Sequence, residues 1–526
     1  MKNQTESPFS NPRFLLVLLI TFVTLWGWQY YINKKYPPVL NNQVVNSEKP
    51  EQTAKLNEEK KLEAVQKSTG EVKNIDPQFA EQKFEYADEK VSFNISSSGF
   101  SFTSFILNDF KNKDFKPMQF INEDLFYAIE YMGKPVPFNI TVSSDKLTYA
   151  GIAQIDGFEI KRTLVYNKEN RFFDSTISFS EGLKNINIIV RQDKIEPKSS
   201  NFLMPSFDHQ DFVNIANNKT VSERISGHKD SEIFSKNFDN VKMASIGSQY
   251  FVSSIIDKSD LIPNVTNKIE GKKATLNLEY KLAGTKTQEL KQVFYIGPKQ
   301  TEIMQKIDSS LPEVLNYGMF GFISKFLVQS MKFIYGFVGN WGLAIIILTL
   351  LVRGILLPAN IMSFRSAQGM QKIKPEMDKI KEKFKADPIR MNKETMALMK
   401  EHKANPLSGC LPMLLQIPVF FAFFAAISNS IELYQQPFFG WINDLSHHDT
   451  FFILPLLMGV TMYFQQKLMP NTMDATQAKI MNFMPIIFTF FMLTLPSGLT
   501  LYNFVSALFG VVQQYFMLKE NKLKTI

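Results

Sequence analysis

The chain has 526 residues, a net charge of +8 and a single cysteine, Cys410. One cysteine excludes an internal disulfide framework and any metal site built from several cysteines. Polar and apolar residues are divided along the chain, because 34–317 is polar whereas 341–518 is mostly apolar. The sequence has no phosphate-binding glycine loop, serine nucleophile elbow or HExxH pattern, so we expect no catalytic residue, no metal and no cofactor.

The first apolar segment, 14–32, is expected to span a membrane. It is longer than the apolar core of a signal peptide and ends in aromatic residues that include Trp26 and Trp28, which suit a membrane interface. Residues 1–13 would then be a cytoplasmic N-terminus. Residues 33–75 are rich in Asn, Gln, Glu and Lys, a composition that predicts a flexible linker without a core.

Residues 76–317 show the period of β-strands. Short runs of alternating apolar and polar residues, such as Phe158–Tyr166 and Ala274–Tyr280, are separated by Gly, Asn, Asp and Pro. This alternation predicts an antiparallel β-sandwich. The length of the region and the lack of an internal repeat favour one large domain over two small ones.

Segment 318–340 has the pattern of an amphipathic helix. Phe322, Phe326, Phe333 and Phe337 recur at helical spacing, and charged residues occur between them. Such a helix is expected to lie on a membrane face and not to cross the membrane.

Five further apolar segments are expected to cross the membrane. Their ranges are 341–361, 411–431, 451–468, 480–496 and 498–518. Loop 362–410 carries eleven Lys and Arg and loop 432–450 carries none, so the first should be cytoplasmic and the second should lie outside. With span 14–32 the chain would cross the membrane six times. Both termini, including the short basic tail 519–526, would be inside, and the β-domain outside.

Arg353 is the most informative residue of the apolar region, because it is the only charge in the run 341–358. A guanidinium keeps its charge in proteins, and one near the bilayer centre costs about 2.5–3.5 kcal/mol on insertion scales. No acid in the run can pair with it. Arg353 is therefore expected to face a water-filled or polar cavity, with Thr349 on the same helix face. The alternative is that backbone carbonyls inside the bundle satisfy it.

The other four predicted spans of this region also carry polar residues and contain no acid or histidine. These residues are Gln416, Thr461, Gln465, Asn482, Thr489, Tyr502, Asn503, Ser506 and Gln513. Each alone can be explained as a hydrogen-bonding contact between helices. The lack of Asp, Glu and His argues against a proton or ion relay.

The basic cytoplasmic loop is expected to form a helical hairpin over 365–404. Met370, Met377 and Phe384 recur at spacings of three and four on its first arm, and Met399 lies on the second. A methionine-rich surface can adapt to varied partners. The alternative is that these side chains only hold the two arms together.

Short motifs in this region resemble the YidC/Oxa/Alb family of membrane protein insertases. They are Asn340-Trp-Gly, Val352-Arg-Gly354, Asn405-Pro-Leu-Ser-Gly-Cys410-Leu-Pro, Gln416-Ile-Pro418, Ile453-Leu-Pro-Leu-Leu-Met-Gly-Val-Thr-Met462 and Pro496-Ser-Gly-Leu-Thr-Leu-Tyr502. The resemblance implies a five-helix insertase core in a bacterial inner membrane, with a hydrophilic groove open to cytoplasm and lipid. Arg353 would be the groove arginine, and Thr349, Gln416 and Tyr502 would line its wall. The β-domain would be the periplasmic supersandwich of Gram-negative members. Asn503 stands where many members have a tyrosine.

The function that follows is insertion of nascent membrane proteins without enzymatic chemistry. A client's polar tail would enter the groove formed by Arg353, Asn503, Ser506 and the wall residues. Its apolar segment would leave along Phe420, Phe424 and Phe488. The resemblance also implies the Sec translocon and the ribosome as partners, and the basic loops suit anionic lipid.

Two rival functions remain at this level. A solute transporter could use the same cavity, although missing inverted repeats and missing acids count against it. A membrane-tethered carbohydrate enzyme would need a constellation of carboxylates in the β-domain, and none is recognisable in the sequence.

Overall fold

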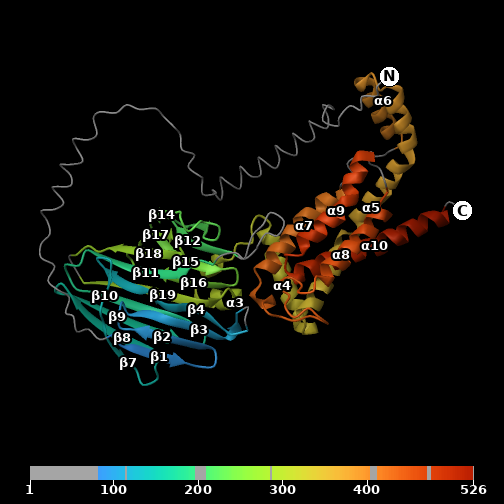
Figure 1. The fold of residues 1–526 in the computed structure, drawn as a ribbon. Coiled ribbons are helices and arrows are strands. Elements are labelled where there is room, and N and C mark those ends of the chain that lie inside the picture. Colours follow the sequence, from blue (N-terminus) through green and yellow to red (C-terminus); the bar gives the residue numbers. More distant parts are fainter. Residues whose placement is uncertain are drawn as a thin grey trace, which may run out of the picture.

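The computed structural model describes residues 81–524 except 113–114, 196–208, 285–286, 403–410 and 471–474. Predictions for 1–13, for span 14–32 and for linker 33–75 lie outside the described residues. Two parts are visible, a β-domain and a helical bundle beside it (Figure 1).

The β-domain contains three antiparallel sheets. The first has the order β1 (Lys83–Ala87), β2 (Val91–Ser96), β3 (Ser101–Lys111), β4 (Pro117–Phe126). The second has the order β13 (Lys219–Arg224), β12 (Gln210–Ala216), β15 (Val241–Ser248), β16 (Phe251–Asp257), β19 (Gln288–Pro298), β10 (Phe172–Phe179), β9 (Phe158–Asn167), β8 (Thr148–Ile155), β7 (Asn139–Val142). The third has the order β14 (Phe234–Phe238), β17 (Asn264–Glu270), β18 (Lys273–Lys281), β11 (Asn185–Asp193), β5 (Ala128–Tyr131), β6 (Lys134–Pro135).

The β-domain core follows from the alternation in the sequence. In β18 every second side chain is buried, from Ala274 through Leu276 and Leu278 to Tyr280. Side chains from all three sheets share one hydrophobic cluster. Burial of one strand face against another sheet is the arrangement that period-2 patterns produce. The prediction of one large antiparallel β-domain is confirmed.

Helices make up the rest of the described chain. After the β-domain come α3 (Thr301–Ile307), the 3-10 turn η2 (Leu311–Val314), α4 (Gly321–Val338), α5 (Trp341–Lys383), α6 (Pro388–Glu401), α7 (Leu411–Ser428), the 3-10 turn η4 (Ile431–Leu433), α8 (Ile453–Leu468), α9 (Ala475–Met492) and α10 (Ser497–Lys524). Between α4 and α5 the chain turns at Gly339, whose φ of 63° lies in the left-handed region. Asn340 then caps α5 by accepting a hydrogen bond from the Leu343 N–H at 3.0 Å.

Helix α5 differs from the sequence prediction, because the span 341–361 and the first arm of the hairpin are one continuous helix of 43 residues. Pro358 and Pro375 lie inside it. A proline removes one backbone hydrogen bond, but the bonds on either side keep the helix in register. The second hairpin arm, α6, begins at Pro388, and the Asp387 carboxylate caps it by accepting from the Arg390 N–H at 3.0 Å.

Two of the described helices are long and apolar enough to cross a membrane, Trp341–Lys383 and Ser497–Lys519. Gln416–Ser428 and Met481–Met492 are shorter apolar helices. The structure therefore shows a helical region with apolar helices, and the number of spans stays a prediction.

The β-domain is joined to the bundle by polar contacts near α4. The Lys332 ammonium on α4 lies 2.7 Å from a Glu302 carboxylate oxygen on α3 and 2.5 Å from one of Glu432 on η4. The Tyr434 hydroxyl donates to the Lys111 carbonyl of β3 at 2.7 Å. These contacts fix the end of the bundle that faces the β-domain, while α6 projects away from it (Figure 1).

Candidate functional site

Arg353 lies on α5 and lines two adjoining cavities. The larger, of about 400 Å³, is open on one side and lined by side chains from α5, α7, α8, α9 and α10. The smaller, of about 90 Å³, lies between α5, α8 and α10. Arg353 and Gln465 line both cavities. We refer to the two cavities together as the groove.

The larger cavity brings together most of the predicted site residues. Gln416, Asn503 and Ser506 supply polar groups, and Phe420 and Phe488 supply an apolar edge where their ring centres are 6.1 Å apart. The lining residues that the predictions did not name as site residues are Ile417, Phe421, Met462, Gln465 and Ala507. The cavity therefore has a polar side near Arg353 and an aromatic side made mainly by α7.

Two predicted wall residues lie behind this surface. Tyr502 is buried, stacks on Phe423 with ring centres 4.0 Å apart, and its hydroxyl accepts from the Gln416 amide at 2.8 Å. Tyr502 therefore holds Gln416 in place and does not itself line the cavity. Thr349 is fully buried and donates to the Ile345 carbonyl of its own helix at 2.6 Å. Its hydroxyl is thereby satisfied within α5.

Phe424 takes a different position from the other two predicted phenylalanines. It packs against the hydrophobic core of the bundle and is not among the residues lining the larger cavity. Phe421, one helical turn before Phe424 on α7, is 48% exposed and takes a place on the cavity edge instead.

Arg353 is the one charged residue among the described residues that line the groove. The other polar groups are amides and hydroxyls, so the lining offers no carboxylate to neutralise the guanidinium. It also offers no pairing of a nucleophile with a general base. The described lining therefore offers one permanent positive charge together with uncharged hydrogen-bond donors and acceptors.

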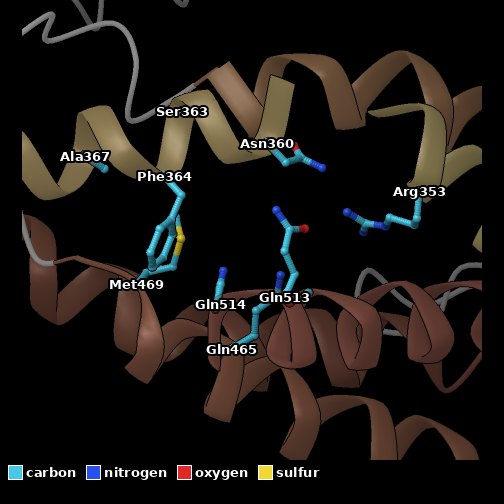
Figure 2. A pocket seen from close by; sticks show the side chains of 10 residues that line it. Arg353, Asn360, Ser363, Phe364, Ala367, Gln465, Met469, Gln513 and Gln514 are labelled. Atoms are coloured by element: carbon cyan, nitrogen blue, oxygen red, sulfur yellow. The ribbon is translucent and has the colours of Figure 1, made fainter. Parts of the chain in front are cut away.

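The smaller cavity contains amide side chains that sequence reasoning did not assign to the site. Asn360, Gln465, Gln513 and Gln514 approach one another between Arg353 at one end and Phe364 with Met469 at the other (Figure 2). The sequence did place Gln465 and Gln513 on polar helix faces. The structure adds Gly510 on α10 to this site, because a Cβ there would overlap the Gln465 side chain.

The hairpin methionines pack mainly against each other. Met370 is buried with Ile373, and Met377, Leu398 and Met399 pack against that pair. Phe384 lies at the end of α5, where the Arg390 guanidinium sits 4.9 Å from its ring centre. These contacts favour the alternative in which the side chains hold the two arms together.

Known proteins match both parts of the chain. The family model described as 60Kd inner membrane protein matches residues 333–524, and the YidC periplasmic domain model matches 186–330. Membrane protein insertase YidC of Campylobacter jejuni is 31% identical over 98% of this chain and 97% of its own. The corresponding protein of Citrifermentans bemidjiense is 48% identical over 43% of this chain and 42% of its own. A crystal structure of an active YidC insertase covers 83% of this chain and 93% of its own at 19% identity and a TM-score of 0.38.

These matches define a non-enzymatic inner-membrane insertase that carries a periplasmic domain. Its clients are membrane proteins. The chain belongs to the YidC family of membrane protein insertases.

Proposed function

We propose that the groove is the path by which a client's polar segment enters the membrane. The observation that carries this proposal is Arg353, which lines both cavities without a carboxylate partner among the described lining residues. A charge in that position is stable only with water or with a bound polar group. The groove therefore holds water at rest and a client's polar tail during insertion.

The aromatic side of the larger cavity gives the client its exit. Phe420, Phe421 and Phe488 lie where α7 and α9 meet the cavity, and Phe424 packs behind them. A client's apolar segment slides along this edge into lipid. Burial of about 20 apolar residues in the hydrocarbon core supplies the driving force, so no nucleotide is needed.

The arrangement in the membrane follows from charge and exposure. Six spans, with segment 14–32 as the first, place both termini and the hairpin in the cytoplasm and the β-domain in the periplasm. On α4, Phe322 is 88% exposed and Phe337 is 76% exposed. Such exposure suits a helix lying on the periplasmic face of the inner membrane. The Sec translocon, the ribosome and anionic lipids are partners that the basic cytoplasmic loops would suit.

Cysteine accessibility tests whether the groove contains water. In a Cys410→Ser background, single cysteines replace Gln416, Gln465 or Asn503, which line the larger cavity. Inverted vesicles are then treated with a membrane-impermeant maleimide. We expect rapid labelling at all three positions, because a thiol must be hydrated to ionise and react.

The matched control is Ile355→Cys. Ile355 lies on α5 beside Arg353, is 77% exposed and lines neither cavity. In the proposed arrangement it faces hydrocarbon and should remain unlabelled. Unlabelled thiols at Gln416, Gln465 and Asn503, in protein that inserts a short client in vesicles, would contradict the hydrated groove.

A further inference from the structure

The smaller cavity of the groove is lined by a cluster of amides, which we call the amide cluster: Asn360, Gln465, Gln513 and Gln514. They come from three helices, α5, α8 and α10. Figure 2 shows Asn360 and Gln513 reaching toward each other across the space between the helices, with Arg353 beside them. Three helices thus contribute uncharged polar side chains of one chemical type to one small space.

Two features show that this space is a built site. A Cβ on Gly510 would overlap the Gln465 amide nitrogen, so the glycine is what lets Gln465 lie across α10. Gln514 is 7% exposed, and its amide oxygen has no hydrogen-bond partner. A buried acceptor left unpaired is unfavourable, so an acceptor kept in this state is ready for a donor from a ligand.

The chemistry of the cluster differs from that of Arg353. A guanidinium only donates hydrogen bonds, whereas each side-chain amide offers two donors and one acceptor. An extended peptide presents one N–H and one C=O at nearly every residue, and each is costly to leave unpaired away from water. Amides can satisfy both groups for any sequence, and they neither attract nor repel a charged side chain.

Asn360 and Gln513 lie farther than Arg353 from the N-terminal ends of their helices. At 1.5 Å per residue, Arg353 is about 18 Å and Asn360 about 29 Å from the start of α5 at Trp341. Gln513 is about 24 Å from the start of α10 at Ser497. In the proposed membrane arrangement both helices begin outside, so Asn360 and Gln513 lie toward the cytoplasmic end of the groove, while Gln465, which lines both cavities, joins them to Arg353.

We propose that the amide cluster binds the peptide backbone of the client's polar segment, independently of side-chain charge, before that segment reaches Arg353. This inference rests on the proposed function of the groove. It assigns the two ends of the groove different tasks. The cluster accepts any extended chain, and Arg353 then discriminates by charge.

The test is insertion of two short clients into vesicles that contain the purified full-length protein. The clients differ only in their polar tails, one neutral and built from Ser, Gly and Ala, the other acidic. The variant Gln465→Met/Gln513→Met keeps side-chain length and removes two amides. We expect insertion of both clients to fall by the same factor, roughly tenfold, as the loss of one or two hydrogen bonds implies.

The matched control is Gln466→Met. Gln466 is the neighbour of Gln465 on α8 and lines neither cavity, so both clients should insert as with the unchanged protein. A double variant that inserts both clients normally, or that loses only the acidic client, overturns the inference. Failure of the unchanged protein to insert either client would instead count against the proposed function.

A second measurement guards against a misfolded double variant. A cysteine at Gln513, in the Cys410→Ser background, is paired with single cysteines placed at successive positions along each client tail. Binding of the backbone predicts disulfide cross-links with similar yield for the neutral and the acidic tail. Cross-links confined to the acidic tail would overturn the inference, because they would show recognition of charge.

Discussion

The β-domain and the helical bundle each contain a largely buried arginine, and they differ in whether the surrounding protein supplies hydrogen-bond acceptors to the guanidinium. Arg162 on β9 is fully buried, and one guanidinium nitrogen donates to the carbonyls of Phe100 at 2.8 Å and Tyr127 at 3.0 Å. The guanidinium carbon also lies 4.2 Å from the Tyr127 ring centre. Arg353 instead faces two cavities.

The difference shows what each region is built to do. The β-domain supplies acceptors to its charge from within, because the Ser175 hydroxyl also accepts from Arg162 at 3.3 Å and only the second terminal nitrogen is left without a partner. The network continues as the Tyr127 hydroxyl donates to Gln292 at 2.7 Å. Such a charge fixes one structure and has little left to offer a partner. In the proposed groove the same side chain is left for water or a client to satisfy, which would suit a site that must bind and release.

The largest expected effect is on stability, at Arg162. Arg162→Met leaves buried carbonyls of Phe100 and Tyr127 without donors, and we expect it to lower the free energy of unfolding of the β-domain by about 3–5 kcal/mol. Arg353→Met should change stability by less than about 1 kcal/mol, since it removes no internal partner. Pulse proteolysis of the full chain in detergent across a urea series measures both.

The control for Arg162→Met is Lys161→Met on the same strand. Lys161 forms an exposed ion pair with Glu159 at 2.7 Å, and exposed pairs contribute about 0–1 kcal/mol. Equal losses at Arg162 and Lys161 would show that the enclosed network is not what stabilises the domain.

Lys299 is a further buried charge of the chain, and its compensation by neighbouring groups is incomplete. Burial lowers its pKa to about 8, and the nearby Asp211 offsets only part of that effect. Below pH 8 Lys299 is charged in both the folded and the unfolded state, so the folded state bears the whole cost of burying the charge. As the pH rises from about 8 toward the unfolded-state value near 10.5, the unfolded state holds more protons, so stability rises with pH.

Lys299→Met should therefore be more stable than the unchanged protein below pH 8, by up to about 3 kcal/mol. The gain should shrink as the pH approaches 10. Urea unfolding at pH 7 and pH 9.5 measures it, with exposed Lys306→Met on α3 as the control. A gain that does not vary with pH would exclude the buried charge as its cause.

The smallest effect in free energy concerns Arg353 and its clients. In a hydrated groove one ion pair contributes only about 1 kcal/mol, so Arg353→Ala should slow insertion of an acidic-tailed client about fivefold more than that of a neutral-tailed client. Arg353→Lys should keep much of the activity because it keeps the charge. Equal defects for both clients would rule out attraction and leave hydration as the role of Arg353.

The sequence was sufficient wherever the signal is local and periodic. In β18 the buried face repeats at every second residue, so the β-domain could be predicted from alternation alone. The order of its sheets could not, because β19 pairs with both β16 and β10, and those pairings depend on contacts far apart in the chain. Likewise, the predicted span ended at 361 because polar residues follow it, but a change of polarity does not end a helix, and α5 continues without a break to Lys383.

For the groove, Arg353 could be predicted because its charge is costly anywhere else in an apolar segment. The roles of Thr349 and Tyr502 could not, since helix periodicity gives a face but does not say whether a hydroxyl points into a cavity or bonds to a carbonyl behind it. The amide cluster depends on how closely α8 approaches α10 at Gly510, a property of two helices together.

Because α5 is one continuous helix, a displacement at its C-terminal end is transmitted along its length, as along a lever. At 1.5 Å per residue, its 43 residues extend over about 65 Å, with Arg353 only about 18 Å from the end at Trp341. That end is held where Trp341 stacks on Tyr335, with ring centres 4.0 Å apart. If α5 pivots about Trp341, a sideways displacement of its far end is about 3.5 times smaller at Arg353, because the two distances from Trp341 are about 65 Å and 18 Å. Pro358, five residues beyond the arginine, is a point where α5 can bend, and the stiffness of the helix there sets how much of a displacement of the hairpin is transmitted to Arg353.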